Sequence, residues 1–151
     1  MKKLYVASIV YLVLGLASGL FYREYTKSLD FTGSTQLAVT HTHVLTLGFM
    51  VMLIVLALDA VLKISGTRSF SWFFATYNAG LVVTVGVMVW HGMLQVQGQT
   101  DVSAAIPGIA GIGHILLTVG LTSLLVALRR PVREAIARRT VVPGVPSGDQ
   151  R

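Results

Sequence analysis

The chain has 151 residues, of which only 12% are charged, and its mean hydropathy is +0.73. A soluble domain of this length needs more charge on its surface, so the composition favours an integral membrane protein. The absence of Cys excludes disulfides, thiolate zinc sites, iron–sulfur clusters and haem attached through Cys. The net charge of +6 does not indicate nucleic-acid binding, because the basic residues lie at the ends of apolar segments.

Four apolar segments predict an all-α fold, an integral membrane four-helix bundle. They cover residues 4–22, 37–62, 70–95 and 105–128. Each has at least about 18 residues, enough to cross a hydrocarbon core of about 30 Å at about 1.5 Å per residue. The first segment has the basic start and small residues of a cleaved signal peptide, but its apolar core is long for one, so we expect a helix. The bundle then occupies residues 1–130.

The basic residues predict the topology. Arg23 and Lys27 follow the first segment, whereas the other ten Lys and Arg residues precede it, lie between the second and third segments, or follow the fourth. The positive-inside rule therefore places both termini in the cytoplasm of a multi-pass plasma-membrane protein. Residues 131–151 are expected to form a basic cytoplasmic tail, partly disordered, that contacts anionic lipid.

All four histidines of the chain, His41, His43, His91 and His114, lie inside the predicted spans. An ionisable residue within a membrane span indicates a functional site. With the predicted topology all four lie in the outer leaflet, within about 6 Å of one another in depth. His91 matches the depth of His41, and His114 matches that of His43.

His41 and His43 are expected on opposite faces of one helix, because two residues correspond to about 200° of rotation. This arrangement disfavours one small ion bound by both and favours two separate ligand positions. Gly108, Gly111 and Gly113 precede His114, and small residues at 15, 18 and 19 share a face of the first segment. These small residues leave room for a flat, bulky ligand, although ordinary helix packing also explains them.

A shift of 71 residues aligns the first two segments with the last two. It places Gly15 on Gly86, His43 on His114, and Leu45 on Leu116. The match predicts two parallel helical hairpin repeats, with His43 facing His114 across the bundle.

Two histidines from facing helices at equal depth suit the axial positions of haem b. We therefore predict His43 and His114 as the axial ligands of a low-spin haem. His41, with His91, is predicted to hold a second cofactor, either another haem or copper. A single haem with His41 as a nearby hydrogen-bond donor stays open. On the same outer side, the candidate partners for the haem propionates are Arg23, Lys27, Gln36, Trp90 and Gln95.

The segment HTHVLTLGF, residues 41–49, resembles the H-x-H-x-x-x-x-G segment in the catalytic subunits of haem–copper oxidases, especially C-type oxidases and nitric-oxide reductases. The resemblance implies that His41 matches the ligand of a high-spin haem and His43 that of a low-spin haem. Those subunits hold a further metal with an adjacent His pair, which this chain lacks, and this argues against oxygen reduction. The whole chain is also similar to a family of small four-span bacterial membrane proteins of uncharacterised function.

Other polar residues within the spans suggest structural roles. Asp59 and Lys63 are spaced for an ion pair along one helix. Tyr77 and Asn78 are expected to form hydrogen bonds between helices, which we favour over a quinone or proton path.

Three functions fit these patterns. The first is a haem-b-binding membrane protein for electron transfer, or for sensing or handling a diatomic gas. The second is a copper- or zinc-binding module for metal delivery, and the third is an assembly subunit without a cofactor. Whether a reaction is catalysed stays open. The expected partners are the lipid bilayer, a quinone or redox protein, and a second copy of the chain in a homodimer, with no nucleic acid.

Overall fold

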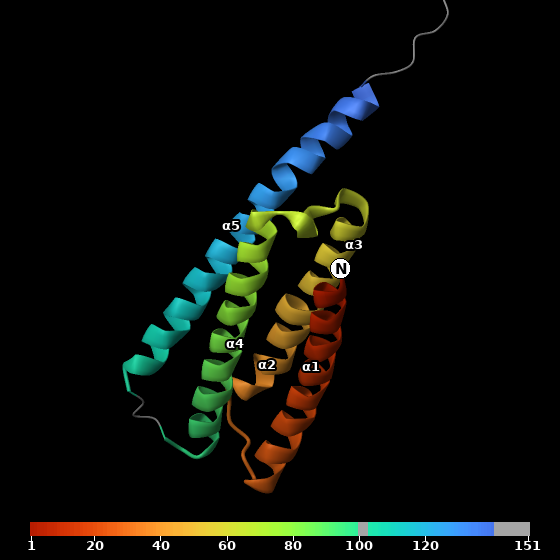
Figure 1. Ribbon diagram of the computed structural model, residues 1–151. Coiled ribbons are helices and arrows are strands. Elements are labelled where there is room, and N and C mark those ends of the chain that lie inside the picture. The colour runs from red at the N-terminus through yellow and green to blue at the C-terminus, as the bar shows by residue number, and fades with distance from the viewer. Residues whose placement is uncertain (100–102, 141–151) are drawn as a thin grey trace, which may run out of the picture.

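The structure, a computed structural model, describes residues 1–99 and 103–140, with side chains up to residue 138 (Figure 1). The all-α prediction is confirmed, and the described residues contain no strand. In chain order the helices are α1 (Lys2–Ser28), α2 (Leu37–His43), the π-helix η1 (Val44–Met50), α3 (Val51–Leu62), the 3-10 helix η2 (Ile64–Gly66), α4 (Arg68–Val96) and α5 (Ala105–Thr140).

Four helical stretches are long and apolar enough to cross a membrane, and they indicate a multi-pass membrane protein. They are Lys2–Ser28, Leu37–Leu62, Arg68–Val96 and Ala105–Arg138. The second stretch is continuous, because α2, η1 and α3 follow one another without a break.

The last helix is longer than the predicted segment 105–128. α5 continues through Pro131 to Thr140, and Arg130 Nε lies 2.8 Å from Glu134 Oε1 one turn further along. Hydropathy marks only the apolar part of a helix, whereas an ion pair of this spacing supports a polar extension. The first ten residues of the predicted tail are therefore helical. The disorder expected for residues 141–151 lies outside the described residues.

The helices pack as two hairpins (Figure 1). α1 packs on α2, η1 and α3, while α4 packs most extensively on α5. Each hairpin brings a glycine onto a tyrosine: a Cβ at Gly48 would come within 2.6 Å of the Tyr11 ring, and a Cβ at Gly120 within 2.8 Å of Tyr77 Cβ. The repeated contact supports the predicted pair of hairpins.

The contacts correct the predicted alignment of the first helix of each hairpin. Gly15 lies against Leu45, and the equivalent Leu116 lies against Gly80. Gly86, the predicted counterpart of Gly15, has open space where a Cβ would be. The shift of 71 residues therefore aligns Leu45 with Leu116 but not Gly15 with its structural counterpart.

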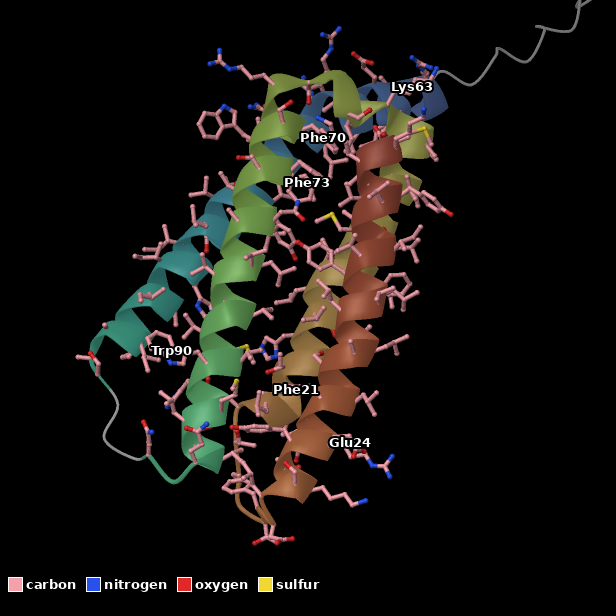
Figure 2. The ribbon with its side chains drawn as sticks, turned by 60° about the horizontal axis from the view of Figure 1, so that its bottom comes forward. Phe21, Glu24, Lys63, Phe70, Phe73 and Trp90 are labelled. Atoms are coloured by element: carbon pink, nitrogen blue, oxygen red, sulfur yellow. The ribbon has the colours of Figure 1, made fainter. Side chains whose placement is uncertain are left out.

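The two tyrosines also link the hairpins. Tyr11 donates its hydroxyl proton to Asn78 Oδ1 at 2.6 Å, and Tyr77 donates to the Leu47 carbonyl at 2.9 Å. These bonds confirm the expectation that Tyr77 and Asn78 form hydrogen bonds between helices. Buried Phe70 and Phe73 belong to the hydrophobic core close to the end where α4 begins (Figure 2).

The predicted ion pair between Asp59 and Lys63 is wrong. Asp59 is buried, accepts a hydrogen bond from the Ser65 amide at 2.7 Å, and lies 3.2 Å from the α-amino group of Met1. Lys63 ends α3 with a left-handed backbone (φ 51°) and an exposed side chain. Because the helix ends there, the spacing of four residues no longer places the two side chains on one helical face.

Candidate functional site: a histidine-lined pocket

Three histidines line one pocket of about 630 Å³ between α2, α4 and α5. They are His43 from α2, His91 from α4 and His114 from α5. The remaining lining residues are Gln36, Val39, Thr84, Val87, Met88, Ile106, Pro107, Ala110 and Gly111. The structure thus brings His43 and His114 to the same pocket, and its walls are mainly apolar.

The rings of His43 and His114 are held in the same way. Nδ1 of His43 lies 2.9 Å from the Val39 carbonyl, and Nδ1 of His114 lies 2.8 Å from the Ala110 carbonyl. A carbonyl oxygen only accepts, so in each neutral ring Nδ1 carries the proton and Nε2 keeps its lone pair. The two bonds are themselves 71 residues apart, so the predicted repeat holds at this point.

This arrangement is chemically compatible with metal ligation by either ring. A histidine that ligates through one nitrogen commonly donates its other N–H to a carbonyl, which fixes the ring orientation. Neither Nε2 atom has a hydrogen-bond partner among residues 1–99 and 103–140. Both are therefore available to a ligand in the pocket.

His91 and Thr84 add polar groups from α4. They are seven residues apart, so they lie on nearly the same face of that helix. The ring of His91 forms no hydrogen bond within the described part of the chain, and Thr84 Oγ1 is buried without a partner there. Sequence analysis missed Thr84, although its spacing from His91 was a signal that could have identified it.

The close approach of α4 to α5 explains the position of Thr84 and His114. Gly113, next to His114, leaves the space that Thr84 Oγ1 occupies. A Cβ at Gly80 would come within 2.8 Å of the Gly113 carbonyl oxygen. Small residues let two helix backbones approach closely, and here they place His114 beside α4.

His41 faces another part of the bundle. A Cβ at Gly19 of α1 would lie 3.6 Å from His41 Cβ, so His41 packs between α1 and α2. Its Nδ1 is buried without a partner among the described residues, and its Nε2 is 3.4 Å from Thr42 Oγ1. His41 and His43 therefore lie on different faces, as their spacing predicts. His91, however, lies with His43 and His114, and His41 does not line that pocket.

Of the residues predicted as partners of the propionates, Gln36 lines the pocket, whereas four do not: Arg23, Lys27, Trp90 and Gln95. The Arg23 side chain is exposed and lies 3.7 Å from Glu24. Trp90 projects from α4 with half of its surface exposed (Figure 2). The backbone N–H of Gln36 donates to Gln95 Oε1 at 2.8 Å.

The histidines reach the pocket from separate walls. Within residues 1–99 and 103–140, no three His, Asp or Glu side chains are close enough together to hold one metal ion.

A family model described as "Protein of unknown function (DUF2871)" matches residues 1–131. The chain belongs to this family. The matched region contains the pocket and all four histidines. Comparison with curated proteins and with solved structures gave no match. Membership of DUF2871 agrees with the expected kinship to a family of uncharacterised function, and it brings no activity with it.

Proposed function

We propose that the protein binds haem b between His43 and His114 and carries electrons within the membrane. The observation that supports this most directly is the matched state of the two rings. Both donate Nδ1–H to the carbonyl four residues earlier, and both leave Nε2 free on one pocket. Two neutral imidazoles that line one pocket from different helices are a ligand set typical of low-spin haem b.

The shape of the pocket supports the same ligand. Its volume of about 630 Å³ is within the usual range for a bound cofactor. Val39, Val87 and Ile106 provide apolar walls, while Ala110 and Gly111 leave space beside His114. Apolar walls exclude water, which favours electron transfer over side reactions of the iron.

Electron transfer is favoured over gas binding because two histidines are prepared as ligands. Iron ligated by both has no open position for a diatomic gas. We assign one haem to the chain, with His41 as a packing residue between α1 and α2. With both termini in the cytoplasm, as the basic residues favour, the pocket lies in the outer leaflet.

The test is an absorption spectrum of the full chain, oxidised and reduced, together with the haem content per chain. We expect a low-spin haem b spectrum in the wild type. His43→Ala and His114→Ala should lose it or convert it to a high-spin spectrum, because each removes an axial ligand. His41→Ala is the matched control, two residues away on the same helix, and should keep the low-spin spectrum.

Other outcomes identify the competing functions. A colourless protein with stoichiometric copper or zinc would support metal delivery. A protein with no cofactor would support an assembly subunit. If His91→Ala loses the low-spin spectrum while His114→Ala keeps it, His91 and not His114 is the second ligand.

A further inference from the structure

A second groove lies between α1 and α4, at the end of the bundle where both helices begin (Figure 2). Its volume is about 470 Å³, and Val6, Val10 and Leu14 of α1 face Phe74 and Val82 of α4 across it. Its lining extends from Lys2 to Leu14, which corresponds to about 18 Å along the helix axis. This length is roughly half of a hydrocarbon core of about 30 Å.

The groove changes from polar to apolar along its length. Lys2 and Lys3 lie at its end, and both are exposed. An adjoining hollow of about 390 Å³ shares these lysines and adds the hydroxyl-bearing Ser65 and Ser71. Beyond the lysines the walls are almost entirely hydrocarbon. A molecule that fits both parts has a negatively charged head and a long apolar chain.

We propose that this groove binds an anionic phospholipid. The phosphate lies at Lys2 and Lys3, and one acyl chain lies between α1 and α4. Lysines close to a membrane surface attract anionic headgroups, and their stems pack along apolar surface while the charged ends remain in water. The groove spans one leaflet, which is the depth that a single acyl chain occupies.

A quinone fits the groove less well, because the Tyr11 hydroxyl and most of the Asn78 amide, the polar groups deep in the groove, are already hydrogen-bonded. Tyr11 donates its hydroxyl proton to Asn78 Oδ1 at 2.6 Å, and Asn78 Nδ2 donates to the Phe74 carbonyl at 2.6 Å. A quinone carbonyl requires a donor, and at this depth the tyrosine has no further proton to donate, while the Asn78 amide keeps one of its two N–H groups. A phospholipid tail needs no hydrogen bond at this depth. The proposal is independent of haem binding, since the groove shares no residue with the histidine-lined pocket.

The test is native mass spectrometry of the full chain in detergent, titrated with phosphatidylglycerol or with phosphatidylcholine. We expect the first phosphatidylglycerol to bind more tightly than phosphatidylcholine. The double variant Lys2→Gln and Lys3→Gln should weaken it about 30-fold, since each lysine near an anionic headgroup contributes about 1 kcal/mol. Val10→Trp should fill the groove and remove the preference for phosphatidylglycerol.

Matched variants serve as controls. Lys63→Gln with Arg68→Gln removes two charges from the same end of the bundle outside this groove, and Val13→Trp adds the same bulk to an exposed position of α1 that does not line it. Both should bind like the wild type, with unchanged helix content. Equal binding of the two lipids, equal weakening in the controls, or wild-type binding by Val10→Trp would overturn the proposal. So would a short-chain quinone that displaces phosphatidylglycerol from both the wild type and Val13→Trp.

Discussion

At the scale of single residues, the Ser and Thr hydroxyl groups inside the spans differ in whether they form a hydrogen bond. Ser8, Thr40 and Thr118 each donate to the carbonyl four residues earlier. Thr84 is only 4% exposed, and its Oγ1 has no partner within the described part of the chain. A buried hydroxyl without a hydrogen bond costs free energy. The position of Thr84 is therefore explained by its packing beside Gly113 at the pocket wall and not by a hydrogen bond.

Replacing Thr84 with Val is expected to stabilise the cofactor-free protein by about 1 kcal/mol, because the shape is kept and an unpaired polar atom is removed. The matched control is Thr40→Val, at a residue that is also buried, which loses the 2.9 Å hydrogen bond to the Gln36 carbonyl. It should destabilise the protein by about 1 kcal/mol. Denaturant unfolding in detergent measures both. Destabilisation of similar size in the two variants would show that the Thr84 hydroxyl is hydrogen-bonded in the folded protein.

At the scale of the elements, the π-helix η1 directly follows His43. π-Helical turns are rare and often occur at functional sites. Two tyrosines contact this segment: the Tyr11 ring packs on Gly48, and Tyr77 donates to the Leu47 carbonyl. The contacts come from α1 and α4, so η1 is held from both hairpins. They fix the helix that carries His43.

The hydrogen bond to Leu47 gives a prediction with a matched pair. Tyr77→Phe should accelerate amide hydrogen exchange across η1, because a neutral hydrogen bond contributes about 1 kcal/mol to the structure it holds. Tyr11→Phe loses the bond to Asn78 but keeps the ring on Gly48, so it should leave exchange in η1 near the wild-type rate. Equal acceleration in both variants would mean that the tyrosines act on the whole bundle, and no acceleration in Tyr77→Phe would mean that η1 is held by packing alone.

At the scale of the whole molecule, hydropathy predicted the spans, and helix rise predicted that His43 and His114 share a layer. Depth along a helix follows from residue counting, but the rotation of a helix about its axis depends on its packing. A Cβ at Gly92 would come within 2.6 Å of the Leu37 backbone nitrogen, and Gly80, also on α4, packs closely against α5. These two close contacts set the rotation of α4. His91 therefore lines the same pocket as His43 and His114, whereas the prediction from depth along the helices had paired it with His41. The π-helix η1 has no sequence signature, and Asp59 meets partners beyond the end of its helix.

The orientation in the membrane is the last property of the whole molecule to be tested. Ser28 and Gly66 lie at opposite ends of the bundle, at the end of α1 and in η2 (Figure 1). Both are exposed, and the chain has no Cys, so Ser28→Cys and Gly66→Cys each create a single labelling site. Because the basic residues concentrate on the Gly66 side, a membrane-impermeant thiol reagent should label Ser28→Cys in intact cells. It should label Gly66→Cys only after the membrane is opened. The reverse pattern would place the histidine-lined pocket in the cytoplasmic leaflet, and its electron partner would then be sought on that side.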